Sequence, residues 1–340
     1  MFFTLSISLF HGAVVFMRDE KEYQRLIAGL KIDLTDEILK GLEDPNILEI
    51  MLNPDGSLWY DGVYGMKNAG KVSRAKAESI IMDVSGIIGK ETHSANPILE
   101  GEFPLSGRFE AIIPPCSSSP LFSLRKLPTV VFPLSDYLEK NIISPAQQEV
   151  IAQAVLDKKN ILVAGSTGSG KTTLTNAIIR EIPAEERIVT IEDTNELKVE
   201  NPNWVALHTS LETDMVRLLM ATMRLRPDRI IVGEVRDKSA HALLKAWNTG
   251  HPGGVATLHA NSCEDALWRL NSLVEEAGVL NQHKLISRAV DLVIFIEKLN
   301  NFNEKTKASR KVTEIKTVID YNGSDFILED VWDTRESIPA

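Results

Sequence analysis

One glycine-rich segment of this 340-residue sequence has the residue types and spacing most directly suited to chemistry. It follows an apolar run, opens a helical pattern, and reads Gly165, Ser166, Thr167, Gly168, Ser169, Gly170, Lys171, Thr172. This is the Walker A pattern in the strand, loop and helix context that it requires. Its glycines let backbone N–H groups turn inward on phosphates, and the helix N-terminus adds the positive end of its dipole. We expect Lys171 to reach the β- and γ-phosphates of ATP, Thr172 to bind Mg²⁺, and Thr173 to complete the nucleotide-binding set.

Polar side chains follow three later apolar runs, at the point where each predicted strand ends. These side chains are Glu192 and Asp193, then Glu234, then His259. Ligands of an open parallel sheet bind at the carboxyl ends of its strands, so we expect all four on the same edge as the glycine-rich loop. A single strand-end glutamate is more often a solvated or capping group, and a single histidine is more often structural. Their shared edge favours the functional interpretation.

Hydrolysis of a nucleotide needs a positioned Mg²⁺ ion, a group that orients water, and cations that neutralise charge on the departing phosphate. Carboxylates and cations are therefore the residue types to expect, and the predicted cofactors are ATP and Mg²⁺. The predicted catalytic residues are Lys171, Glu192, Glu234 and His259, and the predicted metal ligands are Thr172, Asp193 and Glu234.

The C-terminal part of the chain alternates helical patterns with short apolar runs. The runs span residues 161–164, 188–191, 229–232 and 255–258. This rhythm predicts an α/β fold with a P-loop (RecA-like) parallel sheet and helices on both faces. Thr209 and Glu212 are expected to form a capping box at a helix start. The dipeptide Asn322-Gly323 is expected to turn a C-terminal hairpin.

The N-terminal part mixes helical and strand-like patterns, which predicts a smaller α+β domain. Helices are expected near residues 21–30 and 73–88, and strands at residues 47–52, 57–60, 108–113 and 121–125. The expected organisation is an extension at residues 1–18, disordered or a misassigned start upstream of Met17, then the α+β domain at residues 19–128, a linker at 129–145, and the P-loop ATPase domain with its hairpin at 146–340.

Composition excludes some other classes. The net charge of -10 argues against a surface that binds nucleic-acid phosphates throughout. Cys116 and Cys263 lack the paired spacing of a zinc site or disulfide framework, which fits a reducing, cytoplasmic compartment. The apolar stretch at residues 2–16 is shorter than the ~20 residues of a spanning helix. Its first positive charge, Arg18, follows it, whereas a secretory signal begins with basic residues.

Four blocks of sequence together resemble the type II/type IV secretion ATPases. They look like that family's Walker A, Asp box, Walker B and His box, in its order, and they comprise residues 165–172, 191–197, 226–236 and 250–261. Residues 223–228 and 245–254 are most similar to the conjugative-transfer branch, the TrbB-type ATPases. In the N-terminal domain, Arg108 with Phe109 and Arg125 with Lys126 look like the family's paired arginine strands.

The resemblance implies a homo-oligomer, a hexameric ring, with nucleotide between the two domains of each subunit. It implies that Arg108 and Arg125 are catalytic residues that neutralise phosphate charge. The implied partners are inner-membrane components of a conjugation or secretion machine, with the protein cytoplasmic and peripheral to that membrane. Sequence-specific nucleic-acid binding is not expected.

Gly233 stands where many P-loop proteins have the Walker B aspartate, which leaves open whether Glu192 or Glu234 orients water. One alternative function is a type IV pilus or type II secretion motor, although extension-type motors usually carry a Cys-x-x-Cys pair that is absent here. A GTPase would need an Asn-Lys-x-Asp motif, also absent. The other alternative is a nucleotide-gated assembly scaffold that does not hydrolyse ATP.

Overall fold

The computed structural model describes residues 20–62, 65–105, 107–127, 131–210, 212–299 and 310–333. The chain divides into two compact units, Met1–Pro128 and Thr129–Ala340, each with its own apolar core. The expected extension at residues 1–18 lies outside the described residues. Within the described ranges, no helix is long and apolar enough to cross a membrane.

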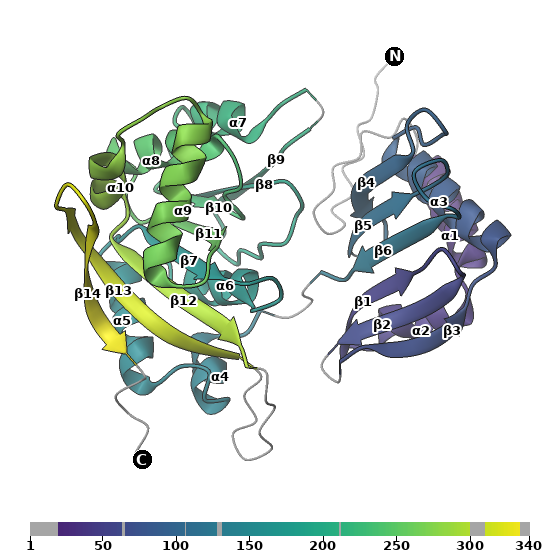
Figure 1. Ribbon diagram of the computed structural model, residues 1–340, viewed down its shortest axis with the longest axis horizontal. Helices are drawn as coiled ribbons and strands as arrows, with labels where there is room; N and C mark the ends of the chain where they lie inside the picture. The colour runs from purple at the N-terminus through teal and green to yellow at the C-terminus, as the bar shows by residue number, and fades with distance from the viewer. Residues whose placement is uncertain are drawn as a thin grey trace. The chain divides into compact units, whose positions relative to one another are not determined.

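The N-terminal unit is a mixed α+β structure, as the sequence predicts. Its described strands form one sheet in the order β3-β2-β1-β6-β5-β4, and its helices lie together on one face of that sheet (Figure 1). The helices are α1 (Glu20–Asp33), α2 (Asp36–Glu43) and α3 (Arg74–Ile88). The strands are β1 (Ile47–Leu52), β2 (Ser57–Gly62), β3 (Lys67–Lys71), β4 (Ile98–Phe103), β5 (Gly107–Ile112) and β6 (Leu121–Arg125).

Local sequence explains several of these elements. Ser73 caps α3 by accepting a hydrogen bond from the Lys76 N–H, and Gly89 ends that helix with a φ of 69°. Asp55 accepts a hydrogen bond from the Ser57 N–H in the turn between β1 and β2. The predicted helices and the predicted first hairpin are confirmed. Strands β3 and β4 were not predicted, since β3 has almost no apolar pattern and β4 contains Gly101 and two glutamates.

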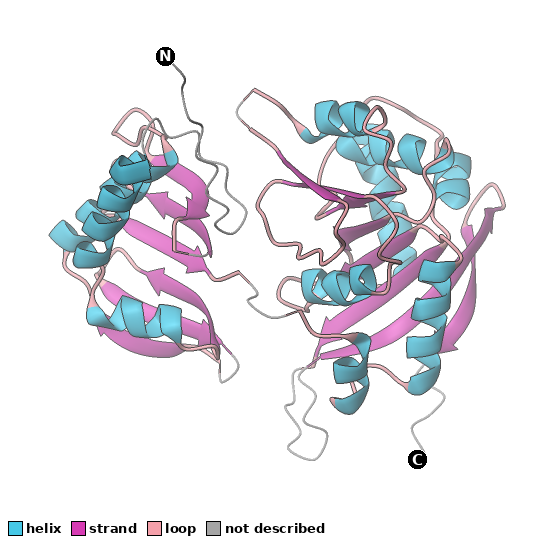
Figure 2. Ribbon diagram, turned by 180° about the vertical axis from the view of Figure 1, so that it is seen from behind, coloured by secondary structure: helices cyan, strands magenta, loops and turns pink. Residues whose placement is uncertain are grey.

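The C-terminal unit is a sheet covered by helices on both faces (Figure 2), so the predicted fold class is confirmed. The described strands follow the order β14-β13-β12-β7-β11-β10-β8-β9. They are β7 (Ile161–Gly165), β8 (Ile188–Glu192), β9 (Trp204–His208), β10 (Arg229–Val232), β11 (Val255–His259), β12 (Leu292–Lys298), β13 (Arg310–Tyr321) and β14 (Phe326–Asp333).

Two sets of helices bury the two faces of this sheet. One core cluster joins the sheet to α4 (Leu134–Glu139), α5 (Pro145–Leu156) and α6 (Lys171–Arg180). The other joins it to α7 (Met215–Thr222), α8 (Ser239–Asn248), α9 (Cys263–Glu276) and α10 (His283–Ala289). Because both faces are covered, all the residues of β7 and of β8 are buried, which explains their continuous apolar runs.

Strand direction determines where the site forms. Strands β7, β11, β10, β8 and β9 pair in parallel, so their carboxyl ends meet at one edge. Strand β12 is parallel to β7, and β13 and β14 form an antiparallel hairpin beyond it. The predicted hairpin around Asn322-Gly323 is confirmed, whereas β9 and β12 were not predicted.

The predicted capping box at Thr209 and Glu212 is wrong. Helix α7 begins at Met215, and the Asp214 side chain caps it by accepting from the Arg217 N–H. The Thr209 N–H instead donates to the Glu192 carbonyl, because β9 continues the sheet to this point. This hydrogen bond to β8 ties the chain at Thr209 to the sheet, so the helix starts later, at Met215.

Gly254→Ala tests the packing of the segment between α8 and β11, which is part of the predicted His box. A Cβ atom at residue 254 would lie 2.0 Å from Trp247 Nε1 and 2.6 Å from the Ile230 carbonyl oxygen. We expect this substitution to reduce the free energy of unfolding by about 2 kcal/mol or more, measured by urea denaturation. Gly86→Ala in α3 is the control, because a Cβ there meets nothing within 4 Å and should stabilise its helix slightly. Equal unfolding curves for both variants would contradict the packing argument.

Candidate nucleotide-binding site

At several positions of the phosphate loop, the backbone conformation or the surrounding space allows only glycine. It runs from the end of β7 to the start of α6 at Lys171. Gly168 and Gly170 have φ angles of 71° and 98°, in the left-handed region. A Cβ atom on Gly165 would lie 2.2 Å from the Ile296 carbonyl oxygen and 2.6 Å from Ser169 Oγ. The loop is therefore a cradle, residues 165–170, formed by backbone atoms, and a side chain at residue 165 would not fit in it.

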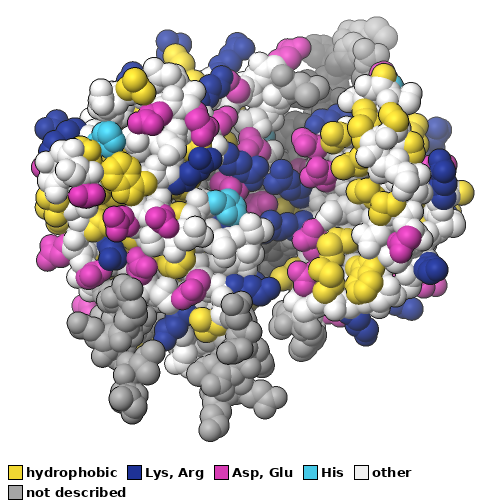
Figure 3. Space-filling view, viewed as in Figure 1, with side chains coloured by type: hydrophobic (Ala, Val, Ile, Leu, Met, Phe, Trp, Pro, Cys, Tyr) yellow, Lys and Arg dark blue, Asp and Glu magenta, His cyan; other side chains and the backbone are white. Residues whose placement is uncertain are grey.

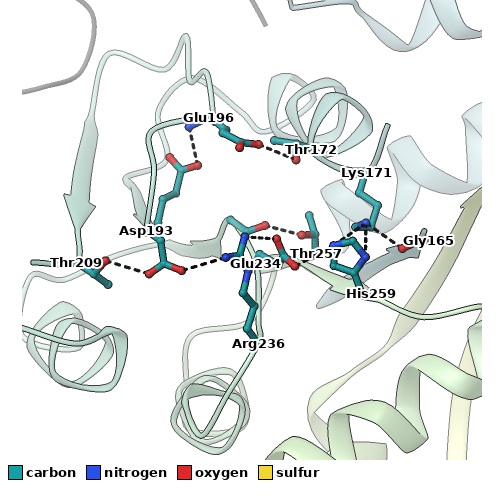
Figure 4. Close-up of polar contacts among 12 residues, drawn as sticks. Gly165, Lys171, Thr172, Asp193, Glu196, Thr209, Glu234, Arg236, Thr257 and His259 are labelled. Atoms are coloured by element: carbon teal, nitrogen blue, oxygen red, sulfur yellow. Dashed lines mark hydrogen bonds and ion pairs between the residues drawn. The ribbon is translucent and has the colours of Figure 1, made fainter. Parts of the chain in front are cut away.

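Lys171 lies inside this cradle and is only 7% exposed. Its Nζ atom donates hydrogen bonds to the Gly165 carbonyl at 2.9 Å and to the Ser166 carbonyl at 3.0 Å. The same atom lies 3.3 Å from Nδ1 and 3.4 Å from Nε2 of His259, from the end of β11 (Figure 4). The lysine therefore connects the loop to the neighbouring strand.

Glu234 continues this line of contacts. Its Oε1 lies 3.1 Å from His259 Nε2, and its Oε2 accepts a hydrogen bond from Arg236 Nη2 at 2.6 Å (Figure 4). Burial on its own would raise the pKa of Glu234, but Arg236, His259 and Lys171 together hold that pKa below its ordinary value. The carboxylate is therefore negatively charged at neutral pH.

Asp193 lies on the other side of Arg236. Its Oδ2 is 4.0 Å from Arg236 Nη1, and its Oδ1 accepts a hydrogen bond from the Thr209 hydroxyl at 3.0 Å. Asp193, Glu234 and Arg236 also line a pocket of about 200 Å³. Figure 3 shows acidic and basic side chains intermixed around a histidine on the surface of this unit.

Glu192 is in a different environment from Glu234, because its side chain is buried with only 2% exposure. Its Oε1 accepts hydrogen bonds from the Glu196 N–H at 3.0 Å and the Leu197 N–H at 2.9 Å. Its Oε2 has no hydrogen-bond partner within the described residues. Burial raises the pKa of Glu192 to about 7, although the two N–H groups oppose that shift.

The Glu192 side chain also explains the glycine in the Walker B block. A Cβ atom on Gly233 would lie 2.9 Å from Glu192 Cγ and 3.1 Å from its Oε1. Glu192 thus occupies the space beside the strand where a side chain at residue 233 would project. An aspartate at residue 233 would displace it, so this chain places a carboxyl group there from the adjacent strand.

The structure thus brings together five of the residues singled out from the sequence. Lys171, His259, Glu234 and Asp193 are joined in one line of contacts through Arg236, and Glu192 lies beside Gly233 next to that line. Two further contributors were not predicted as site residues. They are Arg236 and Glu196, whose Oε2 lies 3.3 Å from the Thr172 hydroxyl. Both belong to the family-like blocks, but neither ends a strand.

Arg108 and Arg125 belong to the N-terminal unit. They lie directly opposite each other in the register of β5 and β6. Their neighbours Phe109 and Leu124 face the helices, so the arginines project from the face of the sheet without helices. In the same register, Arg108 also lies opposite Glu102 of β4, and Arg125 lies opposite Glu49 of β1, so each arginine has a carboxylate on its other neighbouring strand.

The residues present fit both ATP and Mg²⁺. The cradle offers backbone N–H groups at a helix N-terminus, and the buried Ser169 hydroxyl has no hydrogen-bond partner among the described residues. In the described part of the chain, no cluster of three or more His, Cys, Asp or Glu side chains could hold a metal ion. Mg²⁺ usually takes few protein ligands and completes its shell with phosphates and water, so the residues to test for fit are the Thr172 hydroxyl and the nearby carboxylates of Glu234 and Asp193.

A glycine cradle at the carboxyl edge of a parallel sheet, with a buried lysine and carboxylates on the next strands, defines a P-loop nucleotide-binding protein. The particular family follows from sequence comparison. The chain belongs to the type II/IV secretion system protein family, whose model matches residues 77–337.

Individual relatives agree with this assignment. The chain is 44% identical over 304 residues to the probable conjugal transfer protein TrbB of Sinorhizobium fredii, covering 88% of this chain and 91% of the relative. It is 31% identical over 322 residues to the type IV secretion system protein VirB11 of Bartonella henselae, covering 81% and 89%. The fold is similar to that of the pilus retraction motor PilT with bound ADP, with a TM-score of 0.56, 21% identity, and coverage of 86% and 81%.

Glu192→Gln should remove a pH dependence from the stability of the protein. The folded chain retains the Glu192 proton up to about pH 7, whereas a glutamate in the unfolded chain releases it near 4.5. Wild-type stability should therefore fall as the pH rises through this window, and the uncharged variant should gain up to about 3 kcal/mol relative to it. Urea denaturation between pH 4.5 and pH 8 measures the difference, with the exposed Glu185→Gln as control. A difference that is constant with pH would contradict the burial argument.

Proposed function

We propose that this protein hydrolyses ATP with Mg²⁺ and that hydrolysis powers conjugative transfer or type IV secretion, as pilus assembly or substrate translocation. The observation that carries the proposal is the line of contacts from Lys171 through His259 to Glu234, at the edge that carries the phosphate loop. Relatives named for conjugal transfer and type IV secretion support the biological setting.

The side chains support a division of labour in hydrolysis. Backbone N–H groups of residues 165–173 bind the phosphates, Lys171 neutralises charge on the β- and γ-phosphates, and Thr172 binds the metal ion. Bound Mg²⁺ supplies further neutralisation of phosphate charge. In our proposal, Glu234 and Asp193 lie on the side of the metal ion, and His259 positions Lys171 and Glu234 relative to each other.

Glu192 is the residue we propose to orient water. Its pKa of about 7 lies near the working pH, where a general base is most effective, and its Oε2 is available as an acceptor. Glu234 is held as an anion by Arg236, so it is the weaker base of the two. These two properties support Glu192 rather than Glu234 in the proposed role.

The proposed assembly is a hexameric ring of identical subunits. In it, Arg108 and Arg125 from residues 19–128 would act on nucleotide bound by residues 146–340, with residues 129–145 as the linker. The proposed location is the cytoplasmic side of the inner membrane, where the ring associates peripherally with components of a conjugation or secretion machine. The net charge of -10 disfavours sequence-independent binding of nucleic-acid phosphates over the whole surface, and we propose no sequence-specific nucleic-acid binding.

Lys171→Ala should abolish ATP hydrolysis, because it removes the cation that neutralises charge built up on the phosphates. The measurement is phosphate release from purified protein, with the exposed Lys245→Ala on α8 as a matched control. Release at the wild-type rate by Lys171→Ala would overturn the ATPase assignment. Binding of ATP by the wild type without any phosphate release would instead support a nucleotide-gated scaffold.

Arg108→Ala and Arg125→Ala should lower turnover far more than ATP affinity, because an arginine finger acts mainly on the transition state. A loss of about 10³-fold in kcat is expected for a true finger. Arg74→Ala on α3 of the same unit is the control. Turnover within about twofold of wild type in the double variant would eliminate the proposal.

A further inference from the structure

Arg310 begins β13, at the edge of the sheet that carries the phosphate loop. Its register partner is Lys298 at the end of β12, and β12 is parallel to β7. Because β13 is antiparallel to β12, its first residue lies at the carboxyl edge of the sheet. Sequence analysis did not select this arginine, which lies well outside the four family-like blocks.

The Arg310 side chain lies directly against the loop. Its Nε donates a hydrogen bond to the Gly168 carbonyl at 3.2 Å. Its Cδ and Nε atoms lie 3.0 Å and 3.3 Å from the place where a Cβ on Gly170 would be. This close approach is possible because residue 170 has no side chain, and it brings the guanidinium beside the start of α6.

The charge of Arg310 is poorly compensated. Burial lowers the pKa of Arg310, and the nearby Tyr137 of α4 only partly opposes that shift. Arginine nevertheless stays protonated in proteins. Among the described residues, no Asp or Glu carboxylate forms an ion pair with it, although a partly desolvated cation without a counter-ion is costly. An anion bound at the loop would supply the missing charge.

We propose that Arg310 is a nucleotide-binding residue, whose terminal N–H groups bind the diphosphate part of the nucleotide held by residues 165–172. The inference rests on the proposed function. A guanidinium offers several donors in a planar fork suited to phosphate oxygens. Because the diphosphate is common to ATP and ADP, Arg310 stabilises both nucleotides in the ground state. This separates its role from that of Arg108 and Arg125.

The test is Arg310→Gln, with ADP binding measured by calorimetry and ATP hydrolysis measured in the steady state. We expect the Kd for ADP and the KM for ATP each to rise about tenfold or more, as for a lost hydrogen bond to a charged group, with kcat within about threefold of wild type. The dependence of log Kd on log salt concentration should become shallower, because one cation no longer contacts phosphate. Arg310→Lys should recover part of the affinity.

Lys311→Gln is the matched control, because it removes a positive charge from the adjacent residue, whose side chain projects from the opposite face of the strand. Its ADP affinity should equal that of the wild type. Thermal unfolding of each variant shows that it is folded at the assay temperature. An unchanged Kd for ADP in folded Arg310→Gln, or a loss of kcat alone, would overturn the inference. A wild-type protein that binds no ADP would overturn the proposed function and this inference with it.

Discussion

The parallel register of β7, β11, β10 and β8 is the constraint on which the candidate site depends. Pairing of His259 with Gly165 places the histidine beside the first residue of the phosphate loop. Pairing of Val232 with Ile191 places Gly233 beside Glu192. Both faces of these strands are buried under helices, so a shift of register would disrupt two core clusters as well as the site. The stability of the core and the geometry of the site are therefore secured by the same pairings.

Two neighbouring buried carboxyl groups have pKa values shifted in opposite directions, because their contacts differ. The Glu192 carboxyl group is buried, and its hydrogen-bond donors are two backbone N–H groups. The effect of desolvation exceeds that of these hydrogen bonds, so the pKa of Glu192 rises to about 7. Glu234 is also substantially buried, but Arg236 and His259 contact it directly and its pKa is lowered. Pairs of titratable groups whose environments separate their pKa values are typical of sites that need a proton acceptor beside a permanent charge. Glycine at residue 233 makes this possible, because it leaves room for the Glu192 side chain.

Two buried or partly buried arginines of the C-terminal unit differ in how their charge is compensated. Arg229 is fully buried, and it pairs with Glu186 and donates to two backbone carbonyls. Arg310 lies partly buried against a backbone carbonyl, with no carboxylate pairing it in the described residues. A bound polyphosphate would supply the negative charge that Arg310 lacks.

The sequence by itself determined those features that depend on residues close together in the chain. These are the phosphate loop, the apolar runs of the parallel sheet, the two hairpins and the family-like blocks, because glycine spacing and buried strands leave a signal within a few residues. Tertiary structure alone decided that the Thr209 N–H would bond to the Glu192 carbonyl and that Glu192 would fill the space beside Gly233. It also decided that Arg236 would contact Glu234, that Glu196 would contact Thr172, and that Arg310 would lie against the phosphate loop. Most of these contacts join segments that are distant in sequence. They arise only when strands pair and pack, so local pattern does not predict the contacts themselves.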